Sequence, residues 1–149
     1  MNNTQTLQQY LHEHIPLSKA MQVGVVSISD DSIVLSAPLA PNINHRATVF
    51  GGSASAVAIL AAWSLLHTRL TAEGIASRLV IQRNSMSYEL PIEGDFTAVS
   101  ALAEPAQWNQ FLRIFKRKGK ARISVLAELH FAGQVVGRLE GEFVALAMQ

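Results

Sequence analysis

The chain contains no cysteine among its 149 residues. Disulfide bonds, thiolate zinc sites and a cysteine nucleophile are therefore excluded, and any chemistry has to come from other side chains or from the backbone. Charged residues are scarce: they make up 15% of the sequence, whereas 49% of its residues are hydrophobic. Soluble domains usually carry roughly 25% charged residues. We therefore expect that extra surface is buried between subunits.

The sequence also lacks any segment suited to a membrane. No window approaches the roughly 18 uncharged apolar residues that a span requires, and the polar start MNNTQTLQQ lacks the basic-then-apolar order of a secretory signal. We therefore expect a cytoplasmic protein with no membrane partner. The net charge of +1 argues against a nucleic-acid partner, because phosphate-driven affinity needs a broad basic surface.

The length fits a single domain spanning residues 1–149, since two domains would each be too small. Spacing of apolar residues predicts a short amphipathic helix over Thr4–Glu13 and a helix over Ser53–Leu70, which Ser53 could cap. The second helix is apolar on all sides and therefore belongs in a core. Alternation and turn residues predict the strands Met21–Ser29, Ile33–Ala37, Ser77–Tyr88, Asp95–Ala103, Lys120–Phe131 and Val135–Ala147. The expected class is α+β with a mostly antiparallel sheet.

This order of elements resembles the hotdog fold, in which an antiparallel sheet wraps around one long central helix. The segment Met86–Asp95 (MSYELPIEGD) looks like the strand-end signature of that fold. Two further segments, Ala37–His45 (APLAPNINH) and Thr48–Ser53 (TVFGGS), are similar to one hotdog branch, the YiiD C-terminal domain family of thioesterase-like proteins. The resemblance covers nearly the whole chain. It implies a homodimer that acts on acyl thioesters carried by phosphopantetheine, and this branch has been linked to decarboxylation of malonyl-acyl carrier protein (malonyl-ACP).

The junction between the loop and the apolar helix could bind a substrate carbonyl group. Glycines let a substrate approach the backbone, and the first amides of a helix lack intrahelical partners and lie at the positive end of its dipole. A thioester oxygen that gains negative charge would be stabilised there, which makes Gly52 and Ser53 catalytic candidates. Phe50 and Gly51 are substrate-binding candidates. Alternatively, the glycines only form a tight turn into the helix.

Polar residues in the preceding loop, Pro38–Gly52, are further candidates. Asn44 is the primary catalytic candidate, because a neutral amide can donate to a carboxylate or enolate oxygen without titrating. Asn42 and His45 are substrate-binding candidates, although asparagines in such loops often form turns and His45 could simply face solvent. Asn84 is expected to reach the site from the strand of a partner subunit.

No Asp or Glu occurs between Asp31 and Glu73, whereas hotdog thioesterases usually carry a carboxylate in this region. Hydrolysis needs a group that activates water or attacks the carbonyl, while decarboxylation needs a stabilised enolate. The favoured function is therefore decarboxylation of malonyl-ACP to acetyl-ACP in fatty-acid biosynthesis. Two alternatives stay open: an acyl-coenzyme A or acyl-ACP thioesterase that uses His45, Ser55 or an acid from elsewhere in the dimer, and a non-catalytic acyl-thioester binder.

Five of the twelve basic residues lie within the seven positions 116–122. Such a cluster could receive the acidic surface of an acyl carrier protein or the phosphates of coenzyme A. The substrate-binding candidates in it are Lys116, Arg117, Lys118 and Lys120. Alternatively, an exposed loop and strand start carry these charges to stay soluble and to protect a sheet edge.

No cofactor is expected beyond the phosphopantetheine that carries the substrate. His12 and His14 fall on different faces of a helix without further ligands, so no metal site is expected either. His67 follows Trp63 by one helical turn and is interpreted as structural. The expected partners are a second copy of the chain, with a tetramer also allowed, and an acyl carrier protein or coenzyme A thioester.

Overall fold

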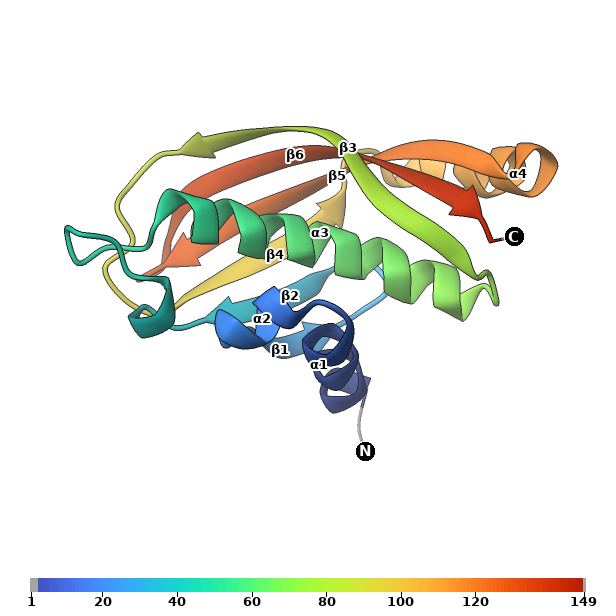
Figure 1. The fold of residues 1–149 in the computed structure, drawn as a ribbon. Coiled ribbons are helices and arrows are strands. Elements are labelled where there is room, and N and C mark those ends of the chain that lie inside the picture. The colour runs from blue at the N-terminus through green and yellow to red at the C-terminus, as the bar shows by residue number, and fades with distance from the viewer. Residues whose placement is uncertain (1–2, 149) are drawn as a thin grey trace.

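An antiparallel sheet bends around one long helix in the computed structural model of the protein, which describes residues 3–148 (Figure 1). The six strands follow the order β1-β2-β4-β5-β6-β3, and every neighbouring pair is antiparallel. The strands are β1 (Gly24–Ile28), β2 (Ile33–Ala37), β3 (Ser77–Tyr88), β4 (Phe96–Leu102), β5 (Lys120–Phe131) and β6 (Gln134–Ala147). The predicted α+β class, with a sheet wrapped around a central helix, is confirmed.

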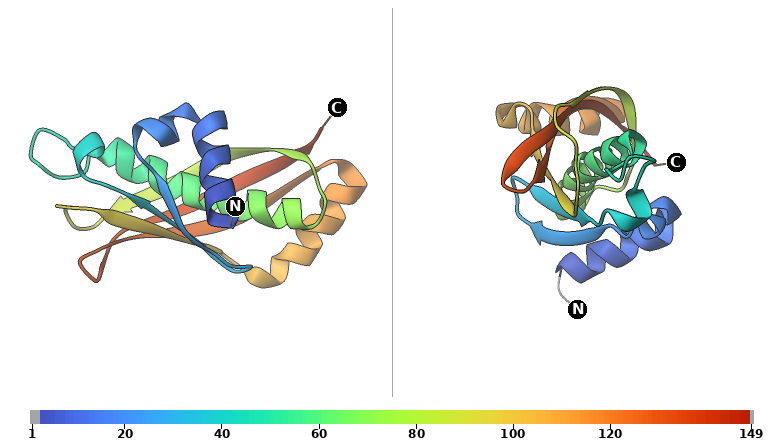
Figure 2. Two further views of the ribbon diagram at one scale, coloured as in Figure 1. Left: turned by 90° about the horizontal axis from the view of Figure 1, so that it is seen from below. Right: turned by 90° about the vertical axis from the view of Figure 1, so that its left-hand side faces the viewer.

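The helices lie at three places around this sheet (Figures 1 and 2). Helix α3 lies against the inner face of the sheet, α1 packs on the edge strand β1, and α4 packs on the start of β5. No helix among residues 3–148 is both long and apolar enough to cross a membrane. The helices are α1 (Asn3–His14), α2 (Pro16–Ala20), α3 (Gly51–Ala72) and α4 (Trp108–Lys118), with short 3-10 turns η1 (Ala40–Asn42) and η2 (Pro105–Gln107).

Helix α3 forms the core because its buried residues are almost all apolar. Val57, Ala61 and Leu65 have no exposed surface, and the helix contacts β2, β3, β4, β5 and β6. The many alanines let its backbone lie close to the sheet, where Val125 and Phe143 fill the space between them. Because an apolar helix is stable only where protein surrounds it, the sheet curves around α3.

The start of α3 differs from the sequence prediction. The helix begins at Gly51, two residues before Ser53, and Phe50 occupies the N-cap position without a side-chain capping bond. The prediction that Ser53 caps the helix is therefore wrong. Both glycines belong to the first helical turn and not to the loop, so the turn itself is uncapped by any side chain.

Helix α4 was not predicted, and the basic cluster lies on its last turn and on the start of β5, not in a loop. Trp108, Phe111, Leu112 and Phe115 are all buried. Their spacing of three and four residues is that of one helix face, so the sequence carries a helical signal here. Helix α4 ends at Gly119, whose φ of 69° places it in the left-handed region that favours glycine.

The N-terminal helix covers the β1 edge of the sheet. The backbone amide of Val25 donates to Gln8 Oε1 at 3.0 Å, and His12 Nε2 donates to the Val23 carbonyl at 2.7 Å. The strand predicted over Met21–Ser29 is shorter than expected, because Pro16 begins helix α2 and its turn reaches Gln22. The opposite edge strand, β3, has no such cover from a helix.

Aromatic rings join α1 to α3. The ring of His67 stacks on Tyr10 at a centroid distance of 4.6 Å and on Trp63 at 4.8 Å, and His14 meets the edge of Tyr10 at 4.2 Å. Burial, and then the charge of His14, lowers the pKa of His67 from its usual 6.5. His67 therefore has the packing of a structural residue, as interpreted from the sequence.

We expect the protein to lose stability as the pH falls below about 6.5, the ordinary pKa of histidine. The unfolded chain binds a proton at His67 more readily than the folded chain does, so protonation favours unfolding. This contribution is fully present above about 6.5 and is lost between that value and the lowered pKa. Urea unfolding at about pH 5 and pH 7.5 measures it: His67→Phe should show a smaller decline than the wild type. His45→Gln is the control, and equal declines for all three proteins would contradict the expectation.

Candidate active site

The loop before α3 is held in place by backbone hydrogen bonds. The amide of Phe50 donates to the Asn42 carbonyl at 2.7 Å, and the amide of Val49 donates to the Ile92 carbonyl at 2.9 Å. Ile43 and Val49 form an isolated antiparallel bridge. The loop is thus tied both to itself and to the segment that follows β3, so the first turn of α3 has a defined position relative to the sheet.

The first backbone amides of α3 are available to bind an oxygen atom. The first helical bond runs from the Ala54 amide to the Phe50 carbonyl at 3.0 Å. The amides of Gly51, Gly52 and Ser53 precede it, and an α-helix offers no partner for them. Together with the positive end of the helix dipole, they form a place where negative charge on a ligand is stabilised.

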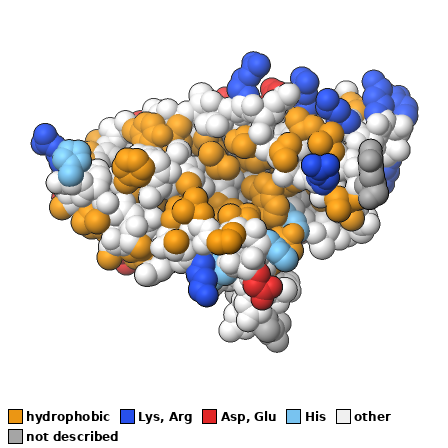
Figure 3. Space-filling model, viewed as in Figure 1, with side chains coloured by type: hydrophobic (Ala, Val, Ile, Leu, Met, Phe, Trp, Pro, Cys, Tyr) orange, Lys and Arg blue, Asp and Glu red, His pale blue; other side chains and the backbone are white. Residues whose placement is uncertain are grey.

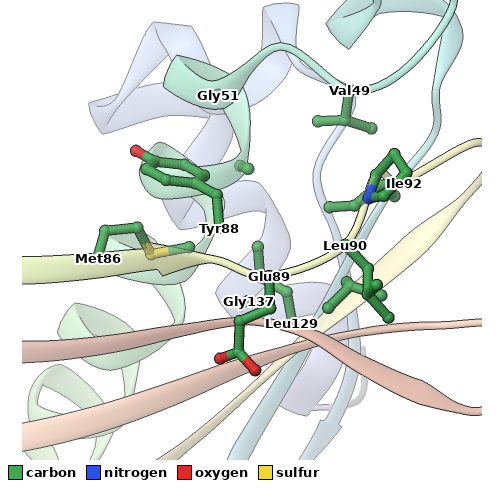
Figure 4. Close-up of a pocket in the computed structure, with 12 residues that line it drawn as sticks. Val49, Gly51, Met86, Tyr88, Glu89, Leu90, Ile92, Leu129 and Gly137 are labelled. Atoms are coloured by element: carbon green, nitrogen blue, oxygen red, sulfur yellow. The ribbon is translucent and has the colours of Figure 1, made fainter.

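A cavity of about 320 Å³ lies beside this turn (Figure 4). Gly51 and Ala54 line it from α3, and Met86 and Tyr88 line it from β3. The remaining lining comes from Val49, from residues 89–92 after β3, and from Leu129, Val136 and Gly137 on β5 and β6. The cavity is therefore mostly apolar, and the first turn of α3 reaches it through Gly51, which suits an acyl chain that ends in a carbonyl group.

Two glycines keep this cavity open. A Cβ at Gly137 would lie 3.2 Å from both the Ser87 carbonyl oxygen and Met86 Cε, which is too close for an easy fit. A Cβ at Gly51 would lie 3.5 Å from Cε1 of Tyr88, which is ordinary contact. Any larger side chain at Gly51 would project into the space between the helix and the Tyr88 ring.

One carboxylate, that of Glu89, belongs to the residues that line the cavity, and the sequence analysis missed it. Its Oε2 accepts from Arg138 Nε at 2.9 Å, and Arg138 Nη1 donates to Glu128 Oε2 at 2.7 Å. Figure 4 shows the Glu89 carboxylate directed away from Gly51 and Tyr88. The acid is thus part of an ion-pair network and is not aimed at the helix amides. The segment MSYELPIEGD contained it, but only the pairing of β3 with β6, which sets Ser87 opposite Arg138, reveals its partner.

Asn44 holds the tip of the loop together. Its Oδ1 accepts from the amides of Arg46 and Thr48 at 2.8 and 3.1 Å, and its Nδ2 donates to Thr48 Oγ1 at 2.9 Å. The second Nδ2 contact, with the Val49 carbonyl, is 3.5 Å long and therefore weak. The turn-forming alternative describes these contacts, and the catalytic role of Asn44 stays a prediction. His45 is exposed at the same tip.

Asn42 has a structural environment. Its side chain is 2% exposed, and its Nδ2 donates to the carbonyls of Pro38 and Met21 at 2.8 and 3.0 Å. Both N–H groups are therefore used within the protein. Asn84 is exposed on the edge strand β3, opposite Gly141 of β6, and its role at a partner's site stays a prediction.

The basic cluster lies at the other end of the molecule from Gly51 (Figures 1 and 2). Lys116, Arg117 and Lys118 form the last turn of α4, and Lys120 begins β5. Helix α3, with 22 residues, separates the two ends, which corresponds to about 33 Å at 1.5 Å per residue. Within one chain the structure does not bring the cluster and the helix amides together.

A larger cavity, of about 890 Å³, lies at the C-terminal end of α3, where Tyr10, His67 and Trp108 contribute to its lining. The negative end of the helix dipole makes this position unfavourable for an oxygen that gains negative charge. The smaller cavity at Gly51 is therefore the better candidate for thioester chemistry. Among residues 3–148, no group of three His, Asp or Glu side chains is placed to hold a metal ion.

Comparison with solved structures places the chain among hotdog-fold proteins. A protein of unknown function from Chlorobaculum tepidum TLS matches with a TM-score of 0.92 and 30% identity, over 97% of this chain and 94% of the other. A "putative thioesterase" from Shewanella oneidensis matches with a TM-score of 0.87 and 25% identity, over 96% of both chains. A thioesterase from Haemophilus influenzae shares the fold, with a TM-score of 0.78 at 10% identity, over 100% of this chain and 94% of the other.

The sequence identifies the family. The profile of the family described as "Putative thioesterase (yiiD_Cterm)" matches residues 4–147. The chain therefore belongs to this family, and it is a hotdog-fold, thioesterase-like protein. The resemblance inferred from the segments around Asn44, Gly51 and Tyr88 is confirmed.

The cavity makes a prediction about residue 51. We expect Gly51→Ala to bind a pantetheine-linked acyl amide within about threefold of the wild-type affinity, because the added Cβ makes only ordinary contact with Tyr88. Gly51→Leu should lower the affinity at least about tenfold, which corresponds to about 1.4 kcal/mol. Titration calorimetry measures both, with thermal unfolding as a control for folding. Equal affinities for the two variants would show that the acyl group binds elsewhere.

Proposed function

We propose that this protein decarboxylates malonyl-ACP to acetyl-ACP at the cavity beside the first turn of α3. One observation carries the proposal: the first turn of α3, whose amides at Gly51, Gly52 and Ser53 precede the first helical bond, reaches an apolar cavity through Gly51, and the one carboxylate in the lining, on Glu89, is held away by Arg138. A free carboxylate in that cavity would repel both the malonyl carboxylate and the enolate that replaces it. Decarboxylation therefore requires that no free carboxylate lies beside the helix amides.

The reaction needs only charge stabilisation and a proton. The bond between the malonyl carboxylate carbon and the α-carbon breaks, and carbon dioxide leaves. The electron pair moves into the thioester and forms an enolate, whose oxygen accepts from the helix amides. A proton from water then adds to the α-carbon and gives the acetyl thioester. One well-placed donor in known oxyanion sites contributes about 3 kcal/mol, so two or three amides account for a large rate enhancement.

Hydrolysis of acyl thioesters is the second candidate, and the family description supports it. It requires a base or a nucleophile near the amides. Ser55 Oγ donates to the Gly52 carbonyl at 3.1 Å, so its proton already has a partner within the helix. His45 is exposed at the loop tip. Neither residue has the paired geometry that activates a nucleophile, which is why hydrolysis ranks second. A non-catalytic acyl-thioester binder ranks third.

The proposal includes a homodimer. Strand β3 is a 12-residue edge strand, and the exposed fractions of Val80 and Tyr88 on it are 47% and 59%. A long unprotected edge of this kind pairs readily with another chain. Figure 3 shows hydrophobic side chains gathered over the face on which α3 and β3 lie. Two copies joined along β3 would cover this face and would place Asn84 near the middle of the joined strands, and its contribution to the partner's site stays a prediction.

We expect malonyl-ACP incubated with the protein to lose 44 mass units, the mass of carbon dioxide, while the acetyl group stays on the carrier. Mass spectrometry of the intact carrier protein measures this change, and butyryl-ACP and malonyl-coenzyme A are the comparison substrates. Release of free malonate or butyrate, with no acetyl-ACP formed, would establish the hydrolase and reject the decarboxylase.

Substitutions at Asn44 separate donation to the substrate from support of the loop. Asn44→Asp keeps the acceptor that binds the amides of Arg46 and Thr48 but loses both N–H donors, whereas Asn44→Ala loses both functions. If Asn44 donates to the substrate, both variants should lower kcat by about 100-fold or more, the effect of removing one oxyanion donor. An active Asn44→Asp together with an inactive Asn44→Ala would assign Asn44 to the loop alone.

A further inference from the structure

The positive charges at the end of α4 form an exposed patch, which we call the α4 patch and define as Lys116, Arg117, Lys118, Lys120 and Arg122. All five side chains are exposed. The ion pairs found within residues 3–148 join Glu89, Glu128, His130 and Arg138, and they include no member of the patch. Figure 3 shows Lys and Arg side chains gathered at this end of the molecule. The α4 patch therefore carries uncompensated charge available to an acidic partner.

The shape of the α4 patch favours a protein over a nucleotide. Its members lie on the outer face of one helical turn and the start of a strand. None of them lines the cavities described here, whereas small anionic ligands usually bind in concave sites. A row of exposed cations on a helix instead suits the surface of an acidic protein, which it attracts and orients over a distance of about one Debye length. The occupant of the patch is accordingly an acidic carrier protein.

Within one chain, the α4 patch is too far from the cavity for a carrier to serve both. Ser77 pairs with Ala147, and the Ala147 amide donates to Gly119 beside the patch at 2.8 Å. Tyr88, at the other end of β3, lies against Gly51. Eleven residue steps along β3 correspond to about 36 Å. A phosphopantetheine arm, a chain of about fourteen atoms, extends only as far as four to five peptide residues, or roughly 16 Å.

Across a dimer the distance is much shorter. Two β3 strands related by a two-fold axis, with both α3 helices on the same face of the sheet, pair antiparallel. Ser77 of one subunit then lies opposite the Tyr88 end of the other. The path from the Tyr88 end of one subunit to the α4 patch of the other crosses three strand spacings: to the partner's β3, then to its β6, then to its β5. At about 4.8 Å each, the path is roughly 14 Å, which is within reach of the arm.

We infer that the α4 patch of one subunit docks the carrier protein whose acyl group enters the cavity of the partner subunit. The inference rests on the proposed function and its dimer, and it adds the carrier protein as the docked species and the direction of delivery. Each complete site then consists of a Gly51 cavity from one chain and an α4 patch from the other.

Cross-linking tests the inference without requiring turnover, because the chain has no cysteine of its own. Met86→Cys places a single thiol in the cavity lining, and a carrier protein whose arm ends in a bromoacetyl group alkylates it. Mixed dimers are isolated with two affinity tags, and only one subunit carries Met86→Cys. The α4 patch is reversed to Glu at Lys116, Arg117, Lys118 and Lys120, either on the subunit with the thiol or on its partner.

We expect reversal on the partner subunit to slow cross-linking by about tenfold or more, and reversal on the thiol-bearing subunit to change it by less than about twofold. The opposite pattern, equal effects of the two reversals, or absence of dimers would overturn the inference. Bromoacetyl-coenzyme A should react equally with both mixed dimers. If patch reversal slowed its reaction as much as it slows that of the carrier protein, docking of the carrier would be rejected. Lys19→Glu, exposed and distant from the patch, is the control for added negative charge.

The turnover experiment on malonyl-ACP is separate from this one. Cross-linking that depends on the partner's patch, in a protein that leaves malonyl-ACP unchanged, would retain the docking geometry and reject the decarboxylase. Decarboxylation with cross-linking that ignores the patch would retain the proposed function and reject delivery across the dimer.

Discussion

The structure depends on one constraint, the burial of an apolar helix inside a sheet that has to curve around it. Helix α3 has no charged face to turn toward water, so the sheet supplies its surroundings. Burial of α3 between Ala54 and Leu70 fixes the direction of the helix, and the loop bonds at Phe50 and Val49 hold its first turn against the end of β3. The uncapped amides are a consequence of this packing. A helix start held by tertiary contacts needs no side-chain cap and can keep its donors for a ligand.

Electrostatics around the turn follow from the same arrangement. With no acid between Asp31 and Glu73, the carboxylate that lines the cavity comes from the end of β3. Arg138, on the neighbouring strand β6, holds it through a pair at 2.9 Å. The register of β6 against β5 sets Arg138 opposite Glu128, so one guanidinium binds two carboxylates. The positive potential at the first turn of α3 is opposed less strongly because the Glu89 carboxylate is paired with Arg138.

The sequence was sufficient to predict the elements whose apolar residues recur with a regular period. The all-round apolar helix and the alternating strands gave the fold, because burial imposes a period that a sequence displays. The start of α3 and the pairing of Glu89 depend on contacts between distant segments, and no local pattern reports them. Helix α4 is a different case: the spacing of Trp108, Phe111 and Phe115 was readable, but the adjacent charges suggested a loop. Asn44 could be singled out from the sequence, but its turn contacts are visible only in the structure. A pattern of residue types cannot separate such contacts from a catalytic role.

The two ends of α3 have opposite chemistry, and this has a consequence for how the protein works. The first turn offers free amides and an apolar cavity, while the last turn lies near α4 and its cations. A single chain holds these features about 33 Å apart, the length of the helix. In the proposed antiparallel two-fold dimer the ends are exchanged, so that each first turn would lie beside the other chain's cations. One long enclosed helix keeps its two ends apart within a chain, and the proposed pairing would complete the site as well as cover apolar surface.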